Sequence, residues 1–293
     1  MSGTQRSNPA NDATRSGEGL DRRQLLTAAA GIAASLGISV AAPALAASRP
    51  RNWPARDVGP FDSFRDYVKA LEDRGLVMRV KRLDQDQYEM TALTYKLMDE
   101  FGWYDAPALL VEEIRQDGRW LKGPVITNHQ GHWDTEAIIW GREPIPGQGP
   151  ETYRETIKFL LEGAEARDGK TPSIPTNPVP ADKAPIKEVI LRGEQCNVLD
   201  FAFIKSNPAD SNRYVNTASV FTEDKELGMN FGTYRCEIKG PRLMGVNPEP
   251  GQQGWKMFMK KKERGDKMAQ VAIVLGQDPI MWVVSSSKLA RGK

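Results

Sequence analysis

Apolar residues recur at helical spacing in two segments of the first half of the chain. The first segment follows Ser63, a residue suited to cap a helix N-terminus, and ends at Gly75. The second begins near Met90 and ends near Phe101. We therefore predict two amphipathic helices, whose buried faces carry Phe64, Tyr67, Val68 and Leu71 in the first and Met90, Leu93, Leu97 and Phe101 in the second.

Short apolar runs between and after these helices predict strands. The runs cover residues 76–80, 108–114 and 125–127, and Gln116-Asp117-Gly118 forms the turn between the last two. Residues 135–140 predict a short helix that Gly141 closes. Alternation of helices and strands is typical of an α/β fold, so we assign residues 48–170 to a small N-terminal α/β domain.

The pattern changes after a proline-rich stretch. Prolines crowd residues 171–185 too densely for a helix or a central strand, and we interpret this stretch as an extended crossing between domains. Beyond it the chain is β-rich, and we assign residues 186–293 to a second domain. Strands are expected at 187–191, 214–221, 229–238, 243–246 and 271–275, with a polar turn at 222–227. Helices are expected at 255–264, ended by Gly265, and after the capping pair Asp278-Pro279.

Residues 1–47 have the pattern of an export signal. Arg22 and Arg23 precede a weakly apolar run of alanine and glycine at 25–40, and Ala44-Leu45-Ala46 resembles a cleavage site. A membrane anchor or an ordinary amphipathic helix are the alternatives, but the run is marginal for spanning a bilayer. We predict a twin-arginine signal, periplasmic or other exported location, and membrane contact only during export. Because this route carries folded proteins, it suits a cofactor inserted beforehand.

Composition narrows the classes of partner. The 293 residues carry 27% charged side chains that balance to a formal net charge of +2. No basic excess is available to neutralise phosphates, so no nucleic-acid partner is predicted. The two cysteines, Cys196 and Cys236, form either buried thiols or a single bridge.

The segment 228–235 holds the strongest chemical signal. Its sequence is Gly-Met-Asn-Phe-Gly-Thr-Tyr-Arg, so an apolar run contains an amide, a glycine and a permanent cation. Arg235 needs an anion, because an unpaired guanidinium among apolar neighbours is costly to desolvate. That anion is a protein carboxylate, which the segment alone slightly favours, or the phosphate or carboxylate of a ligand.

Several stretches together resemble the prenylated-flavin-dependent decarboxylases of the UbiD family. Besides 228–235, they are Tyr214-Val215-Asn216-Thr217-Ala218, Ala184-Pro185-Ile186-Lys187-Glu188-Val189, Gln252-Gln253, Gly276-Gln277-Asp278-Pro279 and Ser285-Ser286. The resemblance extends in patches from about Phe61 to Ser287. It implies that the second domain is the first part of a flavin-reductase-like split β-barrel.

The resemblance also implies a cofactor site. Prenylated FMN would be held by Asn230, Phe231, Gly232, Thr233, Arg235, Gln252, Gln253, Ser285 and Ser286. Asn230 would bind Mn²⁺ or Mg²⁺ through its amide oxygen, and the serine pair would lie near the phosphate and K⁺. Arg235 would be the catalytic arginine. In an unbroken strand Asn230 and Arg235 would face opposite sides, so a common ligand requires a bulge or a kink, which Gly232 is able to supply.

The implied reaction is the reversible, non-oxidative decarboxylation of an aromatic or α,β-unsaturated carboxylic acid, by a homo-oligomer when full length. Gln253 departs from the family, which commonly has a metal-binding histidine there. The family's acidic partners would lie past Lys293, so we expect a fragment, an interrupted gene or completion by a second polypeptide. The rival interpretation is a truncated or diverged flavin-binding module without catalysis.

Two other clusters have mainly structural interpretations. The spacing of His129 and His132 suggests a metal-binding site. However, the glycine between them implies a loop, and only Asp134 is a further candidate ligand. Basic residues on the 255–264 helix are expected to form its solvated side, with a lysine reaching the flavin phosphate as the alternative. These residues are Lys256, Lys260, Lys261, Lys262 and Arg264.

Overall fold

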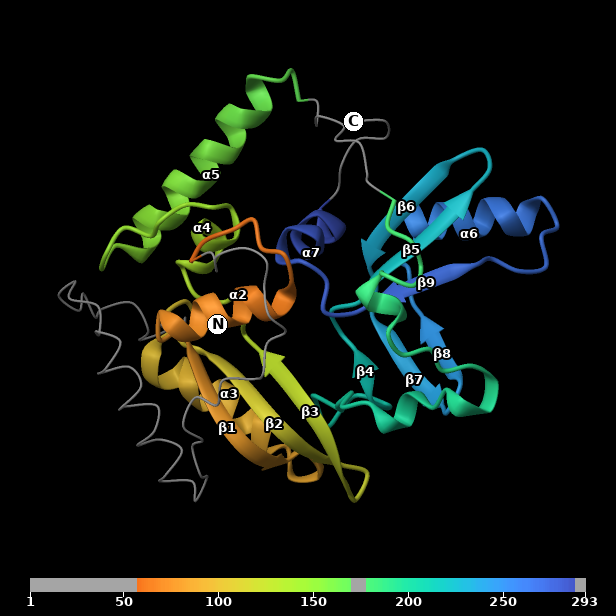
Figure 1. The fold of residues 1–293 in the computed structure, drawn as a ribbon, viewed down its shortest axis with the longest axis horizontal. Helices are drawn as coiled ribbons and strands as arrows, with labels where there is room; N and C mark the ends of the chain where they lie inside the picture. The colour runs from red at the N-terminus through yellow and green to blue at the C-terminus, as the bar shows by residue number, and fades with distance from the viewer. Residues whose placement is uncertain (1–56, 170–177, 288–293) are drawn as a thin grey trace, which may run out of the picture.

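The computed structural model describes residues 57–169 and 178–287, which form two units joined through an irregular segment (Figure 1). The predicted export signal lies outside the described residues. No helix within the described ranges is long and apolar enough to cross a membrane.

The first unit is a three-stranded sheet with helices on both faces. Strands β1 (Val77–Asp84) and β2 (Ala108–Gln116) are parallel and joined by the 3-10 turn η1 (Gln85–Gln87) and helix α3 (Glu89–Phe101). Strand β3 (Arg119–Thr127) pairs antiparallel with β2. The other helices are α2 (Phe64–Asp73), α4 (Thr135–Ile139) and α5 (Gly149–Glu165). The predicted α/β pattern is confirmed, although each strand is longer than expected.

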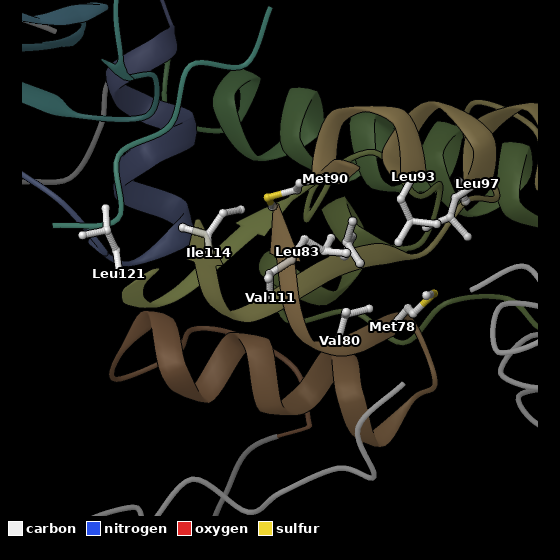
Figure 2. Packing of buried hydrophobic residues seen from close by; sticks show 11 residues of the cluster. Met78, Val80, Leu83, Met90, Leu93, Leu97, Val111, Ile114 and Leu121 are labelled. Carbon is white, nitrogen blue, oxygen red and sulfur yellow. The ribbon is translucent and has the colours of Figure 1, made fainter. Parts of the chain in front are cut away.

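Alternation along the strands divides the apolar residues between two cores. Met78 and Leu109 face α3 in one cluster, whereas their neighbours Val77 and Leu110 join α2 and α4 in the other. Figure 2 shows the α3 cluster, in which Leu93 and Leu97 pack over the sheet. The sheet is therefore buried on both faces, as its apolar strands require.

Helix α2 begins and ends where the sequence predicts. The Ser63 hydroxyl accepts a hydrogen bond from the Asp66 N–H at 3.2 Å, and Gly75 adopts a positive φ of 75° just past the helix. By contrast, α5 was not predicted. Its buried residues are Thr152 and Thr156, so it shows no apolar face toward a core. Its start does carry a signal, because Pro150 occupies the first turn.

The second unit contains two antiparallel three-stranded sheets. One has the order β4 (Tyr214–Val215), β7 (Cys236–Gly240), β8 (Leu243–Val246), and the other β6 (Gly228–Thr233), β5 (Ser219–Asp224), β9 (Val271–Val274). Helices α6 (Gln253–Glu263) and α7 (Pro279–Ser286) complete the unit. Val215, Val220, Tyr234 and Ile238 form the core between the sheets. The described residues form no closed barrel.

Three strand predictions in this unit are wrong. Segments 214–221 and 229–238 each divide into two strands that belong to different sheets, because the chain crosses the shared core at Ala218 and at Tyr234. Residues 187–191 form no strand; η2 (Pro185–Lys187) starts an irregular stretch in which Val189 is 72% exposed. Strand structure requires a neighbouring strand, and among the described residues this stretch has none.

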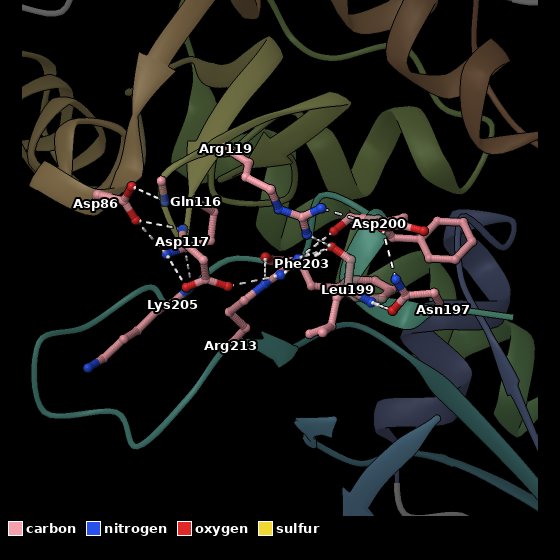
Figure 3. A network of polar contacts seen from close by, with 12 residues as sticks. Asp86, Gln116, Asp117, Arg119, Asn197, Leu199, Asp200, Phe203, Lys205 and Arg213 are labelled. Carbon is pink, nitrogen blue, oxygen red and sulfur yellow. Dashed lines mark hydrogen bonds and ion pairs between the residues drawn. The ribbon is translucent and has the colours of Figure 1, made fainter. Parts of the chain in front are cut away.

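Residues 197–213 link the two units. Several backbone N–H and C=O groups of this segment form hydrogen bonds with side chains. This segment includes η4 (Val198–Asp200) and follows η3 (Gly193–Gln195). Lys205 donates its N–H to Gln116 at 2.9 Å (Figure 3). The Lys205 carbonyl accepts from Gln85 at 2.9 Å. Thr91 donates to the Ser206 carbonyl at 2.8 Å.

Arg213 is the centre of this network (Figure 3). Its side chain is 5% exposed and donates to the carbonyls of Phe203, Phe201 and Leu199 at 2.7, 2.6 and 3.3 Å. It also pairs with Asp117 of the β2–β3 hairpin at 3.1 Å. Asp86 holds that hairpin by accepting from the N–H groups of Asp117 and Gly118 at 2.7 and 2.8 Å. One guanidinium therefore fastens the irregular segment to the first unit.

We expect Arg213→Met to lower the free energy of unfolding by about 3 kcal/mol, because it breaks the ion pair with Asp117 and removes the donor to the Phe203 carbonyl. Urea unfolding followed by circular dichroism measures this loss. Arg119→Met is the control, since Arg119 is 53% exposed and pairs with Asp200 at 3.7 Å; its loss should stay below about 1 kcal/mol. Equal losses in the two variants would contradict a special role for Arg213.

Candidate functional site

Three residues of the predicted cofactor site meet in a cluster of hydroxyls. Thr233 ends β6, and Ser285 and Ser286 form the last turn of α7. The Thr233 Oγ1 atom lies 2.7 Å from Ser285 Oγ and 3.1 Å from Ser286 Oγ. The two serine hydroxyls also donate to the Trp282 carbonyl at 2.8 and 3.1 Å. The fold thus brings together residues that are 52 positions apart in the chain.

Two further polar residues extend this cluster inward. Ser219 on β5 donates to Ser285 at 3.0 Å, and Gln277 donates to Ser219 at 2.9 Å. Both residues are buried. The site prediction missed them, although Gln277 belongs to one of the stretches that carry the family resemblance. Ser219 carried no signal, because its partners lie far away in the sequence.

Helix α7 is positioned by its own N-terminal cap. Asp278 accepts hydrogen bonds from the N–H groups of Ile280 and Met281 at 2.8 and 3.3 Å, and Pro279 occupies the first turn. The helix expected after the capping pair is confirmed, and the β-branched residues that follow do not form a strand. This cap fixes where Ser285 and Ser286 project.

Arg235 lies just after Thr233, between β6 and β7. Its Nη2 atom binds Asp210 at 2.8 Å and its Nε atom binds Asn216 at 2.9 Å. Its guanidinium carbon lies 3.9 Å from the centre of the Tyr214 ring, and the side chain is 46% exposed. A protein carboxylate therefore partners Arg235, as one of the two sequence interpretations held. Nearly half of the side-chain surface of Arg235 is still exposed to solvent.

Asn230 and Arg235 have separate partners. The Asn230 amide nitrogen lies 3.5 Å from the Tyr234 hydroxyl, a contact that does not use the oxygen needed for a metal. Phe231 stacks on Phe221 at 4.9 Å between ring centres. The prediction that Asn230 and Arg235 share one ligand stays a prediction.

The expected bulge at Gly232 is wrong. Gly232 pairs regularly with Val220, and the β6 register runs unbroken from Gly228 to Thr233. The change of direction comes instead at Tyr234 and Arg235, where the chain leaves one sheet for the other. A glycine at 232 is required for another reason, because an added Cβ would lie 2.7 Å from the Tyr234 hydroxyl oxygen.

Tyr234 also fixes the start of α6. Its hydroxyl accepts a hydrogen bond from the Gly254 N–H at 3.0 Å, and a Cβ on Gly254 would lie 2.6 Å from it. Gln252 precedes the helix and accepts from the Glu249 N–H at 2.6 Å. Gln253 is the first residue of α6. The glutamine pair therefore occupies the positively polarised end of a helix that packs near β6.

The basic residues of α6 are only partly solvated, and this corrects the sequence prediction. Arg264 pairs with Asp224 at 2.7 Å, and the Asp224 side chain is fully buried. The hydrogen bond from Arg264 holds the pKa of Asp224 well below its ordinary range. Lys260 and Arg264 also pair with Glu226 at 3.4 and 3.0 Å. Lys256 and Lys262 are exposed, as expected.

The two histidines lie in different surroundings. The His129 ring packs edge-on against Phe64, Tyr67 and Trp282, and its carbonyl accepts from the Tyr67 hydroxyl. His132 instead accepts the Asp134 N–H at Nδ1, at 3.1 Å. Within residues 57–169 and 178–287, no group of three or more His, Cys, Asp or Glu side chains is arranged to hold a metal.

Both cysteines are free thiols. Cys236 lies in the core between the sheets, and burial raises the pKa of its thiol to about 11. A bridge between the cysteines, one of the two sequence alternatives, is therefore excluded in this fold.

Comparison with known proteins finds a family match in the second unit. Residues 177–293 match the model of the UbiD family, described as a 3-octaprenyl-4-hydroxybenzoate carboxy-lyase Rift-related domain. These residues form a UbiD-family domain. The match includes the hydroxyl cluster, Arg235 and both helices of the second unit.

Matches to individual proteins cover most of this chain, including the first unit. A phenolic acid decarboxylase of Escherichia coli O157:H7 is 28% identical over 243 residues, covering 78% of this chain and 46% of the relative. Vanillic acid decarboxylase of Sedimentibacter hydroxybenzoicus, in closed form, matches with a TM-score of 0.65 at 24% identity, over 78% of this chain and 46% of that chain.

A third match is an evolved dimeric form of the UbiD-class enzyme HmfF from Pelotomaculum thermopropionicum, in complex with prFMN. Its TM-score is 0.61 at 24% identity, over 79% of this chain and 48% of that chain. These structures show that both units share the UbiD-class fold. The chain spans about half the length of the relatives it matches.

We expect acid to destabilise the contact between His129 and α7. Burial lowers the pKa of His129 from 6.5 to about 4, so unfolded chains bind its proton more readily. This stabilisation is complete above pH 6.5 and is lost as the pH falls toward 4. The unfolding free energy of the wild type should therefore fall by about 3 kcal/mol from this group between pH 7 and pH 4, and His129→Phe should remove that fall. Parallel pH curves for the two proteins would contradict the assignment.

Proposed function

We propose that the protein to which this chain belongs catalyses a UbiD-type, reversible, non-oxidative decarboxylation of an aromatic or α,β-unsaturated carboxylic acid with prenylated FMN. The observation that carries this proposal is the exposed Arg235 guanidinium, two residues from the Thr233–Ser285–Ser286 hydroxyl cluster. The phenolic acid decarboxylases among the relatives support the choice of substrate class.

The residues present fit the cofactor. Three neighbouring hydroxyls form a polar cluster suited to a phosphate group, as the end of a flavin mononucleotide carries, once the serine hydroxyls turn from the Trp282 carbonyl. Thr233, Ser285 and Ser286 would hold that phosphate with K⁺ nearby, and Asn230 would bind Mn²⁺ or Mg²⁺ through its oxygen. Phe231, Gly232, Gln252 and Gln253 would line the rest of the site. When bound, prenylated FMN supplies an electron sink as CO₂ leaves.

Arg235 would orient the substrate carboxylate. Its charge does not titrate, and its planar fork suits two carboxylate oxygens. Asn216 holds the Nε atom and Tyr214 supports the flat face, so the guanidinium needs little reorganisation when the substrate arrives. Asp210 balances its charge in the absence of substrate.

The proposal extends to the whole fold. We infer that the two sheets of the second unit belong to a flavin-reductase-like split β-barrel that further strands complete. Strands β6 and β9 lie at the edges of their sheet and offer unpaired backbone groups for such strands. We also propose export by the twin-arginine route with cleavage near Ala46 or Ala47. The size and location of the mature protein after cell fractionation would test that export.

A second candidate is a flavin-binding module without catalysis. Gln253 stands where the family commonly has a metal-binding histidine, and a neutral amide oxygen is a weaker ligand. Asp210 already neutralises Arg235. These observations favour binding without turnover.

Co-expression with a source of prenylated FMN separates the candidates. The coding region should be read past Lys293 and the complete protein purified. A flavin absorption spectrum, together with CO₂ release from a panel of cinnamic and hydroxybenzoic acids, would support the decarboxylase. Flavin retention without CO₂ release from any acid would support the second candidate, and absence of flavin would count against both.

We expect Arg235→Ala to lower kcat/KM for CO₂ release about 100-fold, because a charged contact to the reacting carboxylate is lost. Arg242→Ala is the matched control, since Arg242 is exposed in the turn between β7 and β8 and should leave the rate unchanged. Equal rates in the Arg235 variant and the control would remove Arg235 from the mechanism.

A further inference from the structure

Helix α5 contacts the rest of the chain along one narrow side. Its buried residues are Thr152 and Thr156, and the Ile145 N–H donates to the Thr152 hydroxyl at 2.9 Å. Phe159 lies beneath the guanidinium of Arg142, 4.8 Å from its ring centre. Figure 1 shows α5 as a rod at the edge of the first unit, with α4 beside it. A 17-residue helix with so little burial leaves most of its surface to solvent.

The opposite side of α5 carries an apolar stripe. Helical spacing places Ile157 and Leu161 away from the two buried threonines, and Leu161 is 59% exposed. Together with Tyr153, whose ring also contacts Trp133 at 5.8 Å between ring centres, they line a shallow groove of about 440 Å³. Tyr153 and Leu161 are 39% and 59% exposed, and Ile157 between them is partly buried. A row of accessible apolar side chains on one helix is typical of a docking surface.

The charges that flank this stripe are divided along the helix. Arg154 and Lys158 border its N-terminal half, and Glu162 and Glu165 border its C-terminal half. Like charges at spacings of three and four residues destabilise a helix, and of these four residues only Lys158 and Glu162 are of opposite charge at such a spacing. Arg154 also pairs with Glu151 on the same helix, in an exposed contact. Among the described residues, Lys158, Glu162 and Glu165 form no ion pair.

An antiparallel copy of the same helix complements this pattern. With Ile157 packed against Leu161 of the copy, Arg154 comes within about one residue of Glu165 along the helix axis, and Lys158 within about two residues of Glu162. Two-fold symmetry repeats each contact, so every member of the two like-charged pairs gains an opposite charge. Antiparallel helix dipoles also attract one another.

We propose that α5 is a self-association surface on which a second copy of this chain docks in antiparallel orientation. The proposal concerns the first unit and is independent of the decarboxylase assignment. One helix from each copy buries less area than a standard interface, so the dimer is weak, with a dissociation constant in the range of about micromolar to millimolar.

Sedimentation equilibrium of the full chain tests the proposal. The wild type should show a reversible monomer–dimer equilibrium. R154E/K158E makes the groove wholly acidic, and E162K/E165K makes it wholly basic, so each should weaken self-association at least tenfold. A mixture of the two variants should associate as a heterodimer, and all four changes in one chain should restore the homodimer. Variants that had lost their fold would not recover in this way.

K69E/K96E is the matched control. Both lysines are exposed on other helices, at 43% and 51%, and pair within their own helix. This variant should dimerise like the wild type. A wild type that stays monomeric at its highest soluble concentration would overturn the proposal. This holds even if α5 is then found to bind another polypeptide. Unchanged association of R154E/K158E would overturn it as well.

Discussion

The structure depends on how one irregular segment satisfies its backbone. Residues 197–213 form little regular structure, yet they join the two units, and their polar groups need partners wherever they are buried. Arg213 serves three carbonyls, and the buried Gln85 and Gln116 bind the two backbone groups of Lys205. Side chains therefore replace the ladder hydrogen bonds that a strand would have supplied. The placement of Tyr214 and Asn216, which hold Arg235, follows from this anchoring.

Helix α7 connects the candidate site to the first unit. Its last turn supplies Ser285 and Ser286 to the hydroxyl cluster, while Ile280 packs against the core under α2 and Trp282 contacts His129. Movement of the first unit relative to the second must therefore either carry these hydroxyls with it or break the contact at Trp282. The site is a property of both units, although most of its residues belong to one.

The sequence predicts local features well and distant pairings poorly. Ser63 and Asp278 mark the starts of their helices correctly, because a cap and its N–H partners lie within three residues. The divided strands are not visible in the sequence, since a switch of sheet depends on neighbours elsewhere in the chain. Asp210 was likewise missed as the partner of Arg235, 25 positions away. The family resemblance supplied what periodicity could not: it identified Thr233, Ser285 and Ser286 as a group before the fold placed them together.

The packing of Tyr234 restricts the order in which this site is able to evolve. The ring fills the space above two glycines on separate elements, Gly232 and Gly254. A lineage that first gained a side chain at either glycine would collide with the phenol, whereas one that first exchanged the tyrosine for a smaller residue would open room for both. A side chain at either glycine therefore requires a smaller residue at position 234 as well.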